Sequence, residues 1–408
     1  MKTSTPVRAL VRRIEARTPA HRDRAIDGLR ALALLAVPTG HWLLGGFTRS
    51  ADGAIHNASP LSAFGGLAPV SWFLQMLGIF FLVGGYASVL SFRRHEGSTG
   101  AWLKGRLARL GRPVLGVTAV WAALLPLLHH GFGVPGDTLR TASTLVIQPL
   151  WFVGVYTVVT ALTPLCVRAA RRLGVWAAAP LLGSVAVVDF LRYGPYADAM
   201  PSWLSVLNIL PGWLFAYQVG VSWGEGRLNR RHAWGLLIGG AALFAALLVW
   251  CGYPMSMVGV PGETRTNSHP PSLLVPALAA AQSGAAILLR DRLGRLLRRP
   301  ALWAPVVVIN LSAMTVLCWH QTAMLAAAIP ASYLGGASGA VPGLVGAPDS
   351  VGWILARLAW MPLFAGLLVL IGRYARGFES PWTRAGAVRR GLAGVLAAGF
   401  AVFALGLA

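Results

Sequence analysis

Long apolar runs recur along this 408-residue sequence from residue 26 to its C-terminal end, and only short polar stretches separate them. A run of about 17 to 25 apolar residues is long enough to cross the ~30 Å hydrocarbon core of a bilayer. The polar stretches are too short for a soluble domain to fold between the runs. The sequence therefore predicts an all-α, polytopic protein with a single membrane domain.

The composition agrees with eleven transmembrane helices. Charged residues make up only 12% of the chain, against roughly 25% in soluble domains, and 56% of the residues are hydrophobic. The predicted spans are residues 26–47, 70–92, 113–130, 147–167, 174–190, 203–223, 233–252, 271–289, 304–329, 352–372 and 391–408.

Basic residues alternate sharply between the connections. The N-terminal tail and every second loop hold 29 of the 35 Lys and Arg residues, whereas the opposite loops hold four. Because cytoplasmic loops carry an excess of Lys and Arg, we expect a cytoplasmic N-terminus and an extracytoplasmic C-terminus in a multi-pass protein of the plasma membrane. A nucleic-acid-binding protein would cluster its basic residues on a soluble face, so the net charge of +22 reflects topology and nucleic acid is not an expected partner.

The chain is expected to divide into three parts. Residues 1–25 are a basic cytoplasmic tail without the apolar stretch of a cleavable signal peptide, and its arginines suit anionic membrane lipid. Residues 26–375 form the membrane core, and residues 376–408 add a cytoplasmic loop and one further helix. The three cysteines fall in separate apolar runs without the spacing of metal ligands, so no metal and no permanently bound cofactor is expected.

Two ionisable side chains of the first span, Arg30 and His41, lie eleven residues apart. Eleven residues at about 100° each complete three helical turns plus about 20°, so both side chains share one helix face. Asp27 precedes Arg30 by three residues and can pair with it. A polar group inside the membrane is costly and indicates function by default. The alternatives without a function in catalysis or binding are that the Arg30 side chain extends to the cytoplasmic surface and that His41 only packs against its neighbours.

Further polar residues lie near the outward ends of the spans. His320 is predicted at a depth close to that of His41, facing it across an outer cavity, although a packing role beside Trp319 is equally compatible. Asp189 lies at the outer end of a helix, where an ion pair with Arg192 is the alternative to substrate binding. The outward loops contain candidates for contacts with sugar hydroxyls, namely His129, His130, Glu263, Asn267 and His269.

Five short motifs occur in an order that resembles the integral-membrane acyltransferase-3 family. The segment RDRAIDGLRALALLAVPTGHW contains a basic residue, ten intervening residues and a histidine, and so resembles the opening of these proteins. The next motif, Ile79–Tyr86, resembles the family's FF-x-x-SG, with Gly84 where serine is usual. It is followed by Arg106-Leu-Ala-Arg109, which matches R-x-x-R. Further on, Gln148–Phe152 resembles an LWF segment, and Leu317–His320 resembles a late span ending in His.

The resemblance implies ten core helices and the transfer of an acyl group, usually acetyl, from an acyl-CoA donor to a hydroxyl group. The acceptor would be a carbohydrate or a glycosylated or lipid-linked molecule. The chain beyond the core adds one predicted helix. The acceptor's identity and membrane face, the acyl chain length and the oligomeric state stay open.

The candidate site residues divide by role. His41 is the expected general base, because an imidazole titrates near neutral pH, with direct acylation of His41 as the rival mechanism. Arg30 would hold the donor, and Arg106 and Arg109 its phosphates, unless those two serve topology alone. His320, Trp151, Asp189 and His269 are candidate contacts for the acceptor. The competing interpretation is a transporter or flippase without covalent chemistry.

Overall fold

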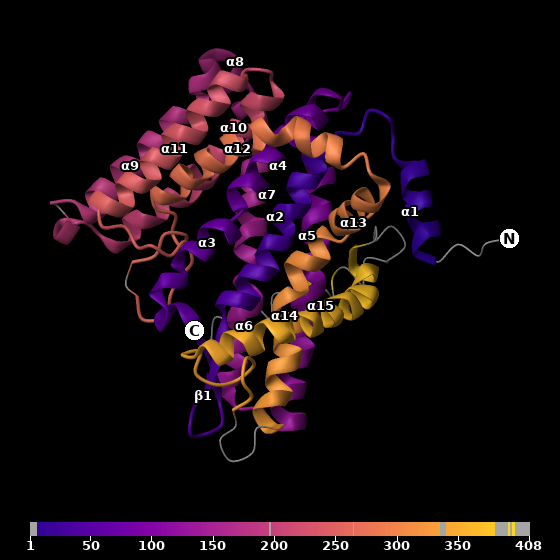
Figure 1. Cartoon of the computed structure of the whole chain (residues 1–408), viewed down its shortest axis with the longest axis vertical. Coiled ribbons are helices and arrows are strands. Elements are labelled where there is room, and N and C mark those ends of the chain that lie inside the picture. The colour runs from indigo at the N-terminus through magenta and orange to yellow at the C-terminus, as the bar shows by residue number, and fades with distance from the viewer. Residues whose placement is uncertain are drawn as a thin grey trace.

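The computed structural model describes residues 6–195, 197–263, 265–334 and 340–379, together with residues 391, 394 and 395. Helices dominate these ranges (Figure 1). They are α1 (Pro6–Arg17), α2 (Arg24–Leu44), α3 (Ala68–Leu74), α4 (Leu77–Arg93), α5 (Thr99–Pro126), α6 (Gly136–Ile147), α7 (Leu150–Ala161), α8 (Thr163–Leu173), α9 (Ala179–Tyr193), α10 (Ile209–Gly224), α11 (Arg230–Trp250), α12 (Leu274–Leu296), α13 (Pro300–Leu311), α14 (Ala313–Leu334) and α15 (Val351–Glu379). The strands β1 (Gly46–Arg49) and β2 (Ile55–Ala58) pair antiparallel, with Gly46 opposite Ala58.

Seven helical segments of the described chain are long and apolar enough to cross a membrane. The number rises to eight if α13 and α14, which meet at a bend of 75°, count as one span. The prediction of an all-α polytopic membrane protein is thus confirmed. Helices also occupy each of the first ten predicted segments. The count of eleven stays a prediction, because most of residues 391–408 lie outside the described residues.

The helices extend beyond several predicted boundaries. The basic tail contains α1, and Arg24, at the start of α2, pairs with its Glu15 at 2.6 Å. α5 starts at Thr99, far ahead of the predicted span, so the R-x-x-R motif is helical. α6 covers most of residues 131–146, which the predicted spans leave as an outward loop. Hydrophobicity locates the membrane-buried part of a helix but not the turns that continue past it.

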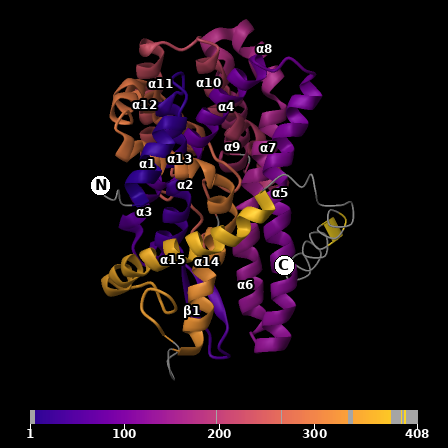
Figure 2. The same cartoon turned by 90° about the vertical axis from the view of Figure 1, so that its right-hand side faces the viewer.

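α2 lies at the centre of the molecule and packs against α4, α12, α13 and α14 (Figures 1 and 2). It begins with an N-cap, because the Asp23 carboxylate accepts a hydrogen bond from the backbone N–H of Ile26 at 3.2 Å. Its first half, including Leu29, joins a hydrophobic core with α4, α7, α10 and α12. Its second half, including Trp42, joins another core with α5, α6, α14 and α15. α2 therefore connects both halves of the protein.

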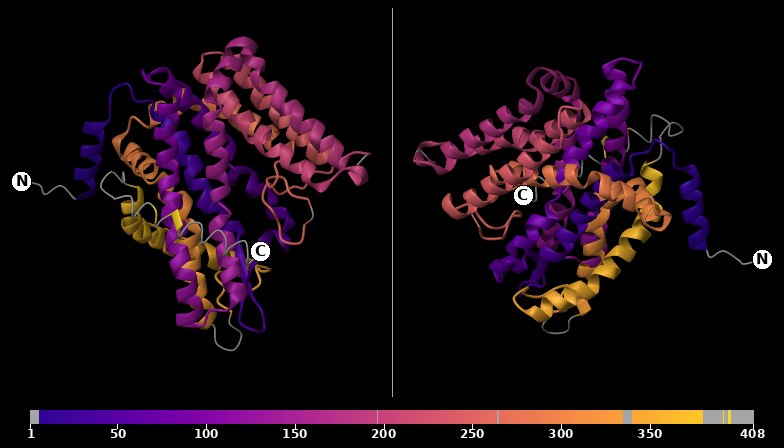
Figure 3. Two further views of the ribbon diagram at one scale, coloured as in Figure 1. Left: turned by 180° about the vertical axis from the view of Figure 1, so that it is seen from behind. Right: turned by 45° about the horizontal axis from the view of Figure 1, so that its top comes forward.

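Glycines bring α4 and α10 unusually close together. A Cβ atom at Gly220 would lie only 1.9 Å from the carbonyl oxygen of Leu82, and one at Gly85 only 2.1 Å from that of Tyr217. Small residues allow helix backbones to approach this closely. Between membrane helices, the van der Waals contacts that result stabilise the packing, because the hydrophobic effect does not drive helix association in lipid. The contact joins the central helices to α8–α11, which lie together on one side of the molecule (Figure 3).

The β1–β2 hairpin follows α2 directly and closes one end of the molecule (Figure 2). The backbone N–H of Ile55 donates to the hydroxyl of Thr138 on α6 at 3.0 Å. Arg357 of α15 is fully buried and donates to the carbonyl oxygen of Gly45, at the junction of α2 and the hairpin, and to that of Gly343. These bonds hold the C-terminal end of α2, where His41 lies.

Candidate active site

Two cavities lie at different heights along α2. The first, of about 240 Å³, is lined by His41, and the second, of about 220 Å³, is lined by Arg30. The two residues are eleven positions apart, which corresponds to about 16 Å along a helix. The structure thus places both predicted residues of the first span in cavities, although not in the same one.

Uncharged polar side chains line the His41 cavity. Among the described residues that line it, none is Asp, Glu, Lys or Arg. The polar members come from five regions of the chain and are Asn57, Ser59, Gln75, Gln148, Trp151, Ser268, His269 and Gln321. Amides and imidazoles both donate and accept hydrogen bonds, so the cavity suits a neutral molecule that carries hydroxyl groups.

The imidazole of His41 is held from one side. Its Nδ1 atom lies 3.2 Å from the Nε2 atom of Gln321 on α14. This is the one hydrogen bond of the His41 ring among the described residues, and it leaves the Nε2 atom without a partner there. A ring fixed through one nitrogen and open at the other has the arrangement that a general base requires.

His320 lies behind His41 and does not line the cavity. The two ring centroids are 5.1 Å apart, and His320 is fully buried. Its Nδ1 atom lies 3.0 Å from the carbonyl oxygens of Val316 and Leu317 in its own helix, so it donates to them. The predicted proximity of the two histidines is present, but His320 supports His41 instead of facing the cavity.

Trp151 and His269 both line the His41 cavity and contact each other. Their ring centroids are 4.8 Å apart and their planes are nearly perpendicular. His269 belongs to the loop between α11 and α12, outside the membrane spans, and burial lowers its pKa below the ordinary value of 6.5. It is therefore neutral at pH 7, which keeps the cavity uncharged.

Asp189 has a different position from the other candidates. It does not line either cavity. Its carboxylate accepts hydrogen bonds from Asn208 at 2.8 Å, from the Tyr253 hydroxyl at 2.8 Å and from the backbone N–H of Leu273 at 2.7 Å. These bonds tie α9 to both ends of the loop that carries His269, so Asp189 shapes the cavity from a distance.

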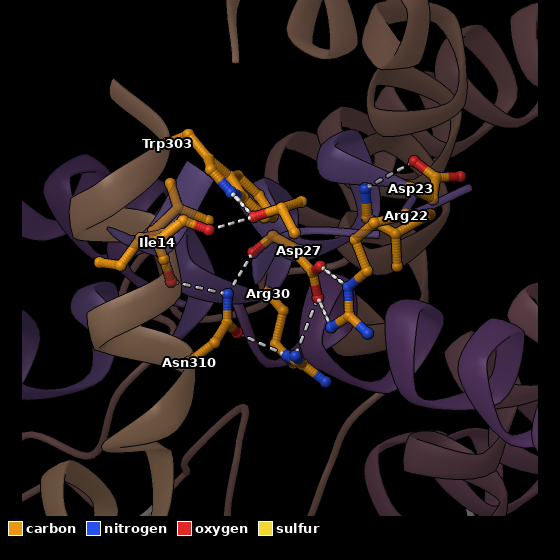
Figure 4. A network of polar contacts seen from close by, with 10 residues as sticks. Ile14, Arg22, Asp23, Asp27, Arg30, Trp303 and Asn310 are labelled. Atoms are coloured by element: carbon orange, nitrogen blue, oxygen red, sulfur yellow. Dashed lines mark hydrogen bonds and ion pairs between the residues drawn. The ribbon is translucent and has the colours of Figure 1, made fainter. Parts of the chain in front are cut away.

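Arg30 is oriented by a polar network at the N-terminal end of α2 (Figure 4). Its Nε atom donates to the Asn310 side chain at 2.5 Å, and its Nη2 atom donates to Asp27 at 2.9 Å. Asp27 also receives two bonds from Arg22, at 2.5 and 2.8 Å. The guanidinium is thus anchored through Nε and Nη2, and Arg30 also lines the second cavity.

Arg106 and Arg109 line this second cavity together with Arg30. Arg106 donates to the Ser88 hydroxyl at 2.8 Å, and Arg109 donates to the backbone carbonyl of Gly105 at 3.2 Å. None of the described residues that line the cavity is acidic. Three guanidinium groups around one space suit a polyanion such as a phosphate-bearing ligand.

Comparison with known proteins identifies the family. Residues 23–372 match the family model of the acyltransferase domain of acyltransferase family 3. The chain belongs to the membrane acyltransferase-3 family. No curated protein and no solved structure shows a significant match to it. The family assignment confirms the resemblance seen in the motifs and makes the protein an acyltransferase.

Aromatic side chains separate the two cavities of this acyltransferase. Phe80 lines the arginine-rich cavity and Phe152 lines the His41 cavity. Their ring centroids are 5.0 Å apart in an edge-to-face contact. Tyr156 stacks on Phe152 and lines the arginine-rich cavity. Side chains of α4 and α7 that line the two cavities are thus in direct contact with each other.

Several side chains of the acyltransferase were not predicted as site residues. Gln75 and Gln321 line the His41 cavity, Tyr156 lines the other cavity, and Asn310 holds Arg30. A polar residue inside an apolar run is a signal of function, and it was available for Asn310 and Gln321. The same signal was present at Gln75, which stands between Leu74 and Met76 in the second predicted span. It is weaker at Tyr156, whose ring is largely apolar.

Proposed function

We propose that this membrane acyltransferase transfers an acetyl group from acetyl-CoA to a hydroxyl group of a carbohydrate or of a glycosylated or lipid-linked acceptor, with His41 as the general base. The observation that supports the proposal most is the pair of chemically different cavities along α2. One offers three guanidinium groups, and the other offers an open imidazole among uncharged polar groups.

The arginine-rich cavity suits the donor. Acetyl-CoA carries phosphate groups, and arginine binds phosphate through two parallel N–H donors. Arg106 and Arg109 lie on the basic side of the chain, which the distribution of Lys and Arg assigns to the cytoplasm. The donor would then enter from the cytoplasmic side of the plasma membrane, in agreement with a cytoplasmic N-terminus.

The His41 cavity suits the acceptor. Aromatic rings such as Trp151 provide an apolar surface for the face of a sugar ring, while the glutamine amides can pair with its hydroxyls. The absence of charged side chains among its described lining residues favours a neutral sugar over an acidic one.

The chemistry follows from these positions. The Nε2 atom of His41 removes the proton of the acceptor hydroxyl, and the oxygen attacks the thioester carbonyl carbon. The C–S bond of the resulting tetrahedral intermediate then breaks, and the thiolate takes the proton from the imidazolium. The products are an acetyl ester and CoA. For the thioester to reach His41, Phe80 and Phe152 must rotate apart.

The test uses purified protein in detergent with radiolabelled acetyl-CoA and a panel of neutral and acidic glycans. We expect a labelled ester on a neutral glycan and none with His41→Ala. Label that remains on the wild-type protein without an acceptor, and is absent from His41→Ala, would indicate an acyl-histidine intermediate instead of a general base. Movement of glycan across vesicles without any ester would overturn the proposal in favour of a transporter.

A further inference from the structure

Gln321 is the described side chain that contacts a ring nitrogen of His41. It lies on α14, is 1% exposed and also lines the cavity. The distance between its amide nitrogen and the Nδ1 atom of His41 is 3.2 Å. Its other amide atom, Oε1, is buried and has no hydrogen-bond partner in the described structure.

The orientation of this amide decides which nitrogen of His41 carries the proton. The oxygen and nitrogen of a glutamine amide are nearly equal in shape, and a rotation of 180° about the last side-chain bond exchanges them. If the amide nitrogen donates to Nδ1, a neutral imidazole must carry its proton on Nε2. If the amide oxygen faces Nδ1, the proton lies on Nδ1 and Nε2 has a free lone pair.

Only the second arrangement makes His41 a base toward the cavity, because Nε2 is the nitrogen without a partner there. We infer that Gln321 is a positioning residue whose oxygen accepts a hydrogen bond from Nδ1–H of His41 and so keeps Nε2 as the base. The inference rests on the proposed general-base function. It assigns to a neutral amide the role that a carboxylate has in a catalytic triad.

Neighbouring groups do not offer an alternative for this role. His320 is close, but its Nδ1 atom is engaged by the carbonyl oxygens of its own helix, and its buried Nε2 atom makes no hydrogen bond in the described structure. His269 lines the same cavity and packs on Trp151. An amide oxygen also stabilises the imidazolium that forms during the reaction, because its dipole points at the developing positive charge.

Three variants test the inference. Gln321→Leu removes the hydrogen bond and should lower kcat at least ~10-fold, since a wrong tautomer of a catalytic histidine is costly, while the KM for acetyl-CoA stays within about twofold. Gln321→Glu keeps an accepting oxygen and should retain most of kcat. Its carboxylate also favours the imidazolium, so the acidic limb of the pH profile of kcat/KM should move to higher pH. Gln218→Leu is the matched control.

Gln218 is a buried amide on α10 that lines neither cavity and donates to the Cys166 carbonyl at 3.1 Å. Its loss should lower thermal stability as much as that of Gln321, but it should leave the pH profile as in the parent. Equal activity of Gln321→Leu and the parent would overturn the inference. So would a Gln321→Glu variant as inactive as Gln321→Leu, because donation by the amide nitrogen would then be the essential contact.

A second readout does not depend on activity. The ¹⁵N spectrum of ring-labelled histidine distinguishes a protonated from an unprotonated nitrogen, and the His41 signals are identified by their loss in His41→Ala. We expect an unprotonated Nε2 in the parent and a mixture of tautomers in Gln321→Leu. A protonated Nε2 in the parent overturns the inference. If the parent formed no ester at all, the proposed function would be overturned. The spectrum would still report the tautomer of His41, so the two failures can be distinguished.

Discussion

The imidazole rings of His41 and His320 lie 5.1 Å apart, yet only His41 lines a cavity. The two residues lie at similar depth, and His320 is sealed behind His41 with no exposed surface. A general base supplies about 10²- to 10⁴-fold in rate, so His41→Ala should lose nearly all product while its thermal stability stays close to that of the parent. His320→Ala should lose stability first, because it leaves a void in a packed core.

Activity per folded molecule separates these outcomes, with the folded fraction measured by size-exclusion chromatography and thermal unfolding in detergent. Retention of more than about a tenth of the rate by His41→Ala would exclude its role as a base.

The paired arginines of α5 should act on the donor. The double variant Arg106→Ala and Arg109→Ala removes two charged hydrogen-bond donors, each worth about 1.5–3 kcal/mol. The KM for acetyl-CoA should therefore rise at least ~10-fold, while the KM for the acceptor stays within about twofold. The matched control is the double variant Arg230→Ala and Arg231→Ala, two exposed arginines outside both cavities. If the KM for acetyl-CoA were the same in both double variants, Arg106 and Arg109 would serve only the orientation of the chain in the membrane.

Gly84 should not tolerate the serine that is usual at this position of the motif. An added Cβ atom would lie 2.8 Å from the Oη and Cε2 atoms of Tyr156. We expect Gly84→Ser to destabilise the protein by about 1–3 kcal/mol, visible as a lower Tm. A second substitution, Tyr156→Leu, should recover part of the loss. Gly154→Ser serves as the control, since a Cβ atom there has open space, and equal Tm values for the two serine variants would contradict the prediction.

Acid should destabilise the loop around His269. Burial lowers the pKa of His269 below 6.5, so the unfolded chain binds more protons than the folded protein as the pH falls from 7 to 5. The free energy of unfolding then decreases toward acid. His269→Gln should reduce the difference in Tm between pH 7 and pH 5, whereas His130→Gln, at an exposed histidine, should leave it as in the parent. If His269→Gln left the difference in Tm between pH 7 and pH 5 unchanged, burial of the His269 ring would not be a source of the acid sensitivity.

Reporter fusions should reveal the orientation. The alternation of basic loops predicts that a reporter fused after residue 230 lies in the cytoplasm and one fused after residue 408 lies outside. Alkaline phosphatase and fluorescent-protein fusions at the two sites report opposite sides. A cytoplasmic signal at residue 408 would remove the eleventh span from the predicted topology.

Features that follow from repeating patterns along the chain could be predicted from the sequence. Apolar runs located the helices, and the spacing of Arg30 and His41 placed both on the face of α2 that lines the cavities. The sequence did not reveal that Arg106 and Arg109 line the same cavity as Arg30, because this depends on how α5 packs beside α2 and α4. Burial of His320 and the contacts of Asp189 were equally hidden, since depth along a helix does not tell which direction a side chain points.

The contact between Phe80 and Phe152 also bears on how well the bilayer stays sealed. Two cavities with polar groups in their walls, stacked along one helix, would, if joined, offer protons and small ions a route through the hydrocarbon layer. Two apolar rings in edge-to-face contact interrupt that route, since a wet path needs polar partners for each water molecule. Under the proposed mechanism, the pair that parts for the thioester would also limit ionic leakage while the enzyme is idle.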